Sequence, residues 1–68
     1  MYATSSSALA ALQGATTDPD IRHALTTAAY LVYHGNVRAA KMVLTQAPAP
    51  WDSDVIAAAM DITDEVAA

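Results

Sequence analysis

The chain has 68 residues, no cysteine and a formal net charge of −4. This length allows one small domain spanning residues 1–68, whose single core barely offsets the loss of chain entropy. The lack of cysteine excludes disulfide bonds and thiolate metal sites, and the excess of acids disfavours a general nucleic-acid binder. We therefore expect a partner protein, or a second copy in a homodimer, to supply the missing stability.

The composition predicts an all-α fold. Hydrophobic residues make up 54% of the chain, and they are largely alanine, with one tryptophan, three tyrosines and no phenylalanine. Such a core depends on close contacts between helices, which favours a small bundle of three to four helices over a sheet. No run of about 18 apolar residues is present, and the first residues lack the basic region of a secretory signal. We expect a cytoplasmic protein with no membrane contact.

The first expected element is a short helix from the serine run at residues 5–7 to about Gln13. The serines can cap its N-terminus, and Gly14 can end it as a C′ residue. A helix of this length is marginal unless it packs, and residues 1–4 are expected to be flexible. Its apolar stripe would consist of Ala8, Leu9, Ala11 and Leu12.

The second expected helix runs from Pro19 to about His34. Asp18 is suited to the N-cap, Pro19 to the first helical position, and Asp20 to the first turn, where the helix dipole favours an anion. Apolar residues recur at helical spacing and predict one buried face. This face consists of Ile21, Leu25, Ala28 and Val32, widened by Ala24 and Leu31.

A very tight turn should join this helix to the third one. Gly35 can adopt the left-handed conformation of a helix C-cap, and Asn36 can cap a helix that continues to about Gln46. The two helices then form an antiparallel hairpin around which the bundle is built. The third helix carries too many apolar residues for one narrow stripe, so it is expected to be the central helix. Pro48 and Pro50 should end it.

The fourth expected helix follows a stiff linker at residues 47–50. Asp52 or Ser53 can cap it, and its inner face has apolar residues at helical spacing: Val55, Ala59, Ile62 and Val66. Trp51, just before this helix, is expected to cover the end of the hairpin. If Trp51 is exposed instead, it is the leading candidate for an interface residue.

Charge is unevenly distributed along the chain. Residues 21–50 contain three bases and no acid, whereas residues 51–68 contain five acids and no base. The acids Asp54, Asp61, Asp64 and Glu65 should form an acidic ridge on the outer side of the fourth helix. Most often such a ridge is solvated, but Asp61 or Glu65 could also pair with Arg38 or Lys41. Alternatively, the ridge could meet a basic surface of another protein.

The hairpin resembles a single tetratricopeptide-repeat unit over residues 24–48. In that family, small and large residues occur at fixed distances before and after a glycine in the turn. The corresponding residues of this chain are Ala28, Leu31, Gly35, Ala40, Leu44 and Ala47. The sequence departs from the pattern at Ala24 and Thr27. The resemblance implies two closely packed antiparallel helices, and a family array needs about three such units to bury its faces.

The same hairpin fits a DNA-binding helix-turn-helix less well. That motif requires a small residue before the turn and an apolar residue after it, where this chain has Leu31 and Lys41. Arg38 and Lys41 nevertheless share one helix face next to His34, and three bases in all give a thin phosphate footprint. A nucleic-acid-linked transcription regulator using this basic edge is therefore the alternative functional hypothesis.

The sequence contains no pattern typical of a catalytic or metal site, so we predict no enzyme and no cofactor. His23 and His34 lie about 16 Å apart along one helix at 1.5 Å per residue, too far to share a metal ion. Asp52 and Asp54 resemble the start of a calcium loop, but the glycine and glutamate that this loop needs are missing. No small-molecule substrate is expected.

The function predicted from the sequence is protein–protein interaction. We expect a small acidic adaptor, or a regulator or inhibitor of a partner protein. Tyrosine, tryptophan and arginine are enriched at interface hot spots, and the charged ridge could add complementarity. The candidate partner-binding residues are Tyr30, Tyr33, His34, Arg38, Trp51, Asp54, Asp61, Asp64 and Glu65.

Overall fold

The computed structural model describes residues 2–46 and 53–67, and these form an all-α bundle, as predicted. The elements are α1 (Ala3–Ala11), a short 3₁₀ helix η1 (Leu12–Ala15), α2 (Pro19–Tyr33), α3 (Val37–Thr45) and α4 (Ser53–Ala67). None of the helices in the described residues is long and apolar enough to cross a membrane.

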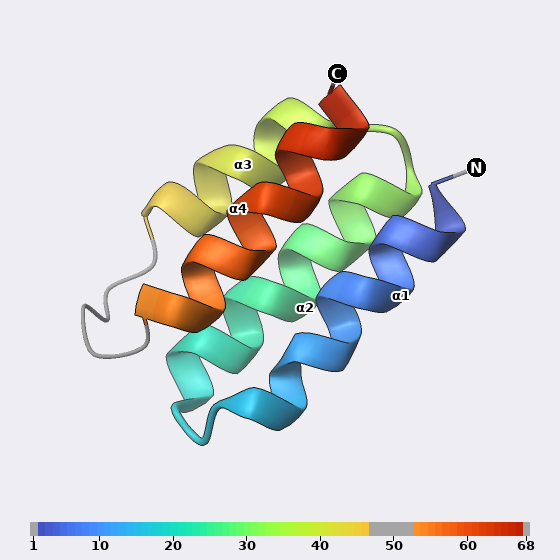
Figure 1. The fold of residues 1–68 in the computed structure, drawn as a ribbon. Helices are drawn as coiled ribbons and strands as arrows, with labels where there is room; N and C mark the ends of the chain where they lie inside the picture. Colours follow the sequence, from blue (N-terminus) through green and yellow to red (C-terminus); the bar gives the residue numbers. More distant parts are fainter. Residues whose placement is uncertain (1, 47–52, 68) are drawn as a thin grey trace.

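The helices run up and down, each antiparallel to the one before it (Figure 1). α1 and α3 pack along α2, and α4 packs against α3 and, less extensively, against α1. The start of α1, the turn between α2 and α3, and the end of α4 consequently lie at the same end of the bundle (Figure 1).

The central helix is α2, so the prediction that the third helix is central was wrong. α2 buries Ala24, Ala29 and all four residues of the predicted face, whereas α3 buries only Ala40 and Leu44. The reason is that α2 is covered from both sides by α1 and α3, while α3 keeps one side exposed to solvent. Small residues at the contact, Ala28 and Ala40, are completely buried and let the two helices approach closely.

Local chemistry fixes both ends of α2 as expected. The Asp18 carboxylate accepts hydrogen bonds from the backbone N–H groups of Asp20 (2.9 Å) and Ile21 (3.4 Å), which satisfies two of the free donors at the helix start. Pro19 occupies the first helical position. The helix ends at Tyr33, with His34 as its C-cap residue.

The turn between α2 and α3 is a Schellman motif. The N–H of Gly35 donates to Val32 O (2.9 Å) and the N–H of Asn36 donates to Leu31 O (2.8 Å). Gly35 has φ +83°, the left-handed conformation predicted for it. The Asn36 side chain in turn accepts from the Ala39 N–H at 3.3 Å and caps α3. The turn therefore leaves almost no free linker between the helices.

α1 differs from the prediction at both ends. It begins at Ala3 rather than after a serine cap, and it ends at Ala11, where η1 continues the chain. Gly14 lies inside η1 and does not have a positive φ, so its assignment as a left-handed C′ residue was wrong. Leu9 is fully buried and Leu12 half-buried, whereas Ala8 and Ala11 are exposed. The Ser6 hydroxyl donates to Ala29 O at 2.8 Å and ties α1 to α2.

The inner face of α4 is wider than the predicted stripe. Ala59 is buried and Val55, Ile62 and Val66 are half-buried, but Thr63 is also completely buried. Its hydroxyl donates to Met60 O at 2.8 Å, so this buried polar group is satisfied within the helix. The predictions for Pro48, Pro50, Trp51 and Asp52 lie outside the described residues.

Candidate interaction surfaces

Three aromatic rings gather at the C-terminal end of α2. The His34 ring lies 4.5 Å from the Tyr30 ring and 5.4 Å from the Tyr33 ring, measured between centroids. Tyr30 and Tyr33 remain 64% and 59% exposed. We call these three residues the α2 aromatic surface. The i, i+4 spacing on one helix places Tyr30 beside His34, and the Schellman turn fixes where the helix stops.

This surface presents apolar ring area together with hydrogen-bonding groups. Single exposed apolar side chains are normal on folded proteins, but here two tyrosines flank one imidazole. Tyrosine rings lose little conformational freedom on binding, and rings already in mutual contact lose less. His23, about two turns before Tyr30 on α2, is exposed as well.

A second surface lies on the exposed side of α3. Arg38, Lys41, Met42, Thr45 and Gln46 line a shallow depression of about 370 Å³. Met42, a large apolar side chain, is 57% exposed on this side of α3. Arg38 and Lys41 share this face, as the sequence predicted. We call these five residues the α3 face.

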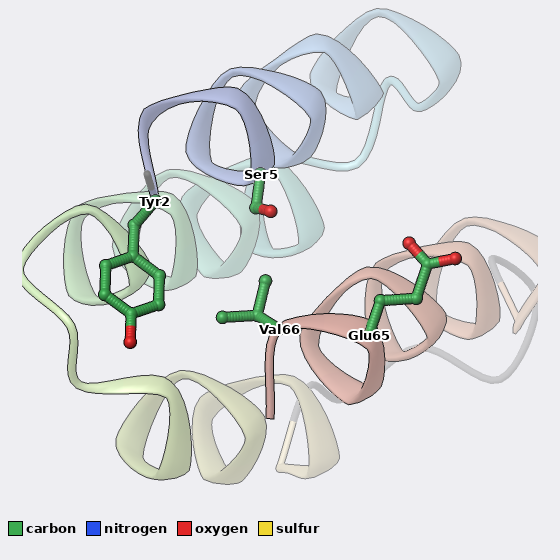
Figure 2. Close-up of a pocket in the computed structure, with 4 residues that line it drawn as sticks. All are labelled: Tyr2, Ser5, Glu65 and Val66. Atoms are coloured by element: carbon green, nitrogen blue, oxygen red, sulfur yellow. The ribbon is translucent and has the colours of Figure 1, made fainter. Parts of the chain in front are cut away.

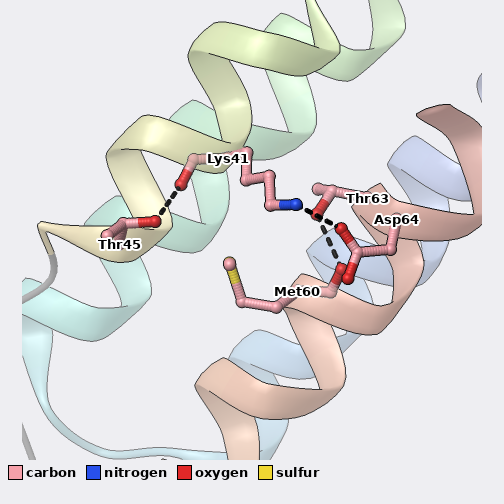
Figure 3. A network of polar contacts seen from close by, with 5 residues as sticks. All are labelled: Lys41, Thr45, Met60, Thr63 and Asp64. Atoms are coloured by element: carbon pink, nitrogen blue, oxygen red, sulfur yellow. Dashed lines mark hydrogen bonds and ion pairs between the residues drawn. The ribbon is translucent and has the colours of Figure 1, made fainter.

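The acidic ridge on α4 is exposed along its length. Asp54, Asp61, Asp64 and Glu65 are all solvent-exposed. Among the described residues there is one salt bridge, in which Lys41 Nζ lies 2.6 Å from Asp64 Oδ1 (Figure 3). The expected pairing of α3 with α4 therefore occurs, but through Asp64 and not through Asp61 or Glu65.

The salt bridge joins the α3 face to the acidic ridge. Thr45 donates its hydroxyl to Lys41 O, and Met60 reaches from α4 toward Thr45 beside the ion pair (Figure 3). The two charged side chains are about half exposed, at 47% and 53%. A pair in this environment contributes at most about 1 kcal/mol, so its main effect is to select the register of α4 on α3.

A second hollow, at the end of the bundle, has no counterpart in the sequence analysis. Tyr2, Ser5, Glu65 and Val66 line a pocket of about 240 Å³, with the Tyr2 ring and Val66 on opposite sides of it (Figure 2). It forms because the start of α1 and the end of α4 meet at this end of the bundle. No periodicity of the sequence reveals such a meeting, since it depends on how helices distant in the chain are placed.

The predicted site residues thus do not form one site. The α2 aromatic surface contains Tyr30, Tyr33 and His34, the α3 face contains Arg38, and the acidic ridge contains the four acids, while Trp51 lies outside the described residues. Within the described part of the chain, no three His, Asp or Glu side chains are grouped so as to hold a metal ion. Sequence reasoning did not place Thr45 and Gln46 beside Arg38, although their i+7 and i+8 spacing is the available signal.

We compared the chain with protein families, curated proteins and solved structures. No family model, no curated protein and no solved structure matches this chain. The resemblance of residues 24–48 to a tetratricopeptide-repeat hairpin stays a prediction from residue spacing.

Proposed function

We propose that this chain is a small cytoplasmic protein-binding module, an adaptor or a regulator of a partner protein, and that it acts without catalysis. The observation that carries the proposal is the α2 aromatic surface, where two tyrosines about 60% exposed lie against His34. Tyrosines are enriched among the residues that dominate binding energy at protein interfaces.

Binding through this surface should depend on both tyrosines. The protein is immobilised, proteins from an extract of its native cells are captured and identified, and the affinity of the purified partner is then measured. We expect Tyr30→Ala/Tyr33→Ala to weaken that affinity by about thirtyfold or more, since truncating one hot-spot residue costs about 2 kcal/mol or more. Both side chains are exposed, so circular dichroism should show an unchanged fold.

Met42→Ala is the matched control, because Met42 is a comparably exposed apolar side chain on another helix. It should leave the affinity of the partner within about twofold. Loss of binding with Met42→Ala, and not with the tyrosine variant, would move the binding site to the α3 face and contradict the proposal.

The second candidate, a nucleic-acid-linked regulator, is less well supported by the same geometry. Arg38 and Lys41 do lie on one exposed face, but Lys41 is paired with Asp64, and the acidic ridge lies next to it. The carboxylates beside Arg38 and Lys41 would repel the phosphates of a nucleic acid. A chain with a net charge of −4 also gains little binding free energy from the release of counterions. Retention of DNA in a filter-binding titration at low salt would favour this candidate.

A further inference from the structure

Two helices of opposite charge lie side by side on one face of the bundle. α3 presents Arg38 and Lys41, and the adjacent, antiparallel α4 presents Asp61 and Asp64. The Lys41–Asp64 pair marks the seam between them. We call this the α3–α4 face. It belongs to different helices from the α2 aromatic surface.

The charges on this face are only partly neutralised by their own chain. Within residues 2–46 and 53–67, the side chains of Arg38 and Asp61 form no ion pair or hydrogen bond, and both are exposed. Met42 also lies exposed in the depression beside Arg38. Among the residues that the structure describes on this face, Arg38 is therefore an unpaired cation, Asp61 an unpaired anion and Met42 an uncovered apolar side chain.

Such a face is complementary to itself. If a second copy is rotated by 180° about an axis parallel to the helices, α3 of each copy faces α4 of the other. Each basic edge then meets an acidic edge, twice in one closed contact. A rotation about an axis across the helices would instead place α3 on α3 and α4 on α4, and like charges would repel. Between these two arrangements, charge thus favours the one with the axis parallel to the helices.

We propose that a second copy of this chain docks on the α3–α4 face and forms a symmetric dimer with basic α3 against acidic α4 in both halves. Charge complementarity identifies the binding partner as a second copy, because the acidic α4 of one copy matches the basic α3 of the other. The proposal does not depend on the function assigned to the α2 aromatic surface.

The dimer should be weak and sensitive to salt. The molecule measures 30 × 19 × 15 Å, so one face buries on the order of 500 Å² per copy, below the roughly 800 Å² of a standard interface. Exposed charges at such a contact are screened over about 10 Å at 0.1 M ionic strength. We expect association at micromolar or higher concentration that weakens roughly tenfold between about 20 and about 300 mM NaCl.

Two charge-reversal variants test this arrangement by sedimentation equilibrium at low salt. In Arg38→Glu the α3 edge becomes less basic, and in Asp61→Lys the α4 edge becomes less acidic, so each variant alone should lose self-association. Both leave the Lys41–Asp64 pair in place. Mixing the two should restore a dimer, because each altered edge then meets a compatible edge of the other copy.

Arg22→Glu is the matched control, since it makes the same change of charge at an exposed position on α2. It should dimerise like the unaltered chain. Restored association on mixing also shows that the variants fold. A chain that stays monomeric at low salt would overturn the proposal, as would variants that fail to associate on mixing, or a mass that keeps growing with concentration instead of stopping at two copies.

Discussion

Gly35 is the residue whose conformation the hairpin depends on most directly. Its φ of +83° lies where a side chain is disfavoured, while a Cβ built there would only reach ordinary contact with the Tyr2 ring, at 3.6 Å. The cost of Gly35→Ala therefore comes from the backbone and not from a clash. We expect it to lower the free energy of unfolding by about 1–2 kcal/mol, measured by urea denaturation.

Gly14→Ala provides the comparison for this prediction. Gly14 has no positive φ, and a Cβ there would meet nothing within 4 Å. In the short helical turn η1, alanine restricts the unfolded chain more than glycine does, so Gly14→Ala should be neutral or stabilising by up to about 1 kcal/mol. Equal losses at both glycines would contradict the role given to the Gly35 turn.

Residues that act through local hydrogen bonds, and the apolar face of α2, could be predicted from the sequence, whereas the buried polar residue Thr63 was missed. Asp18, Gly35 and Asn36 were assigned correctly because a cap or a turn depends on three or four neighbouring residues. The burial of Thr63 was missed because the inner face of α4 was assigned from apolar residues alone, although Thr63 lies four residues after Ala59 at helical spacing.

At the scale of the elements, α1 packs along α2 but buries a single residue of its own. Leu9 is its one buried residue, aided by the hydrogen bond from Ser6 to Ala29 O. Because a nine-residue helix is unstable in isolation, α1 depends on these contacts to remain folded. Leu9→Ala should cost about 2–4 kcal/mol, and hydrogen exchange should show the amides of α1 losing protection before those of α2.

Leu12→Ala is the control for Leu9→Ala, because Leu12 is of the same type but only half-buried in η1. Its cost should be about half as large or less. If α1 amides in the Leu9→Ala variant kept the protection of those in α2, Leu9 could not be the anchor of the helix.

The ends of a helix could be predicted where capping residues mark both of them. Which helix lies at the centre of the bundle could not be predicted. α2 begins and ends within a residue of its predicted limits because of Asp18, Pro19 and Gly35. The central position of α2 was missed because the prediction relied on the number of apolar residues in α3. That number does not say how many of them other helices cover. How many are buried depends on which side α1 and α4 occupy.

For the whole molecule, the uneven distribution of charge could be read from the sequence, but its arrangement in space could not. The division between basic and acidic halves is a property of the chain, whereas the pairing of Lys41 with Asp64 depends on the register of α4 along α3. The two proposed contacts use different helices, and one molecule could therefore hold a partner on α2 and a second copy on α3 and α4.

Photo-cross-linking in the native cells tests the central claim, that the α2 aromatic surface binds another protein. A photoreactive phenylalanine analogue replaces Tyr30 in one variant and Ala10, exposed on α1, in a control variant. We expect the analogue at position 30 to cross-link to a discrete protein other than this chain, and the analogue at position 10 to give no such product. Absence of a product at position 30, or the same products from both positions, would contradict the account.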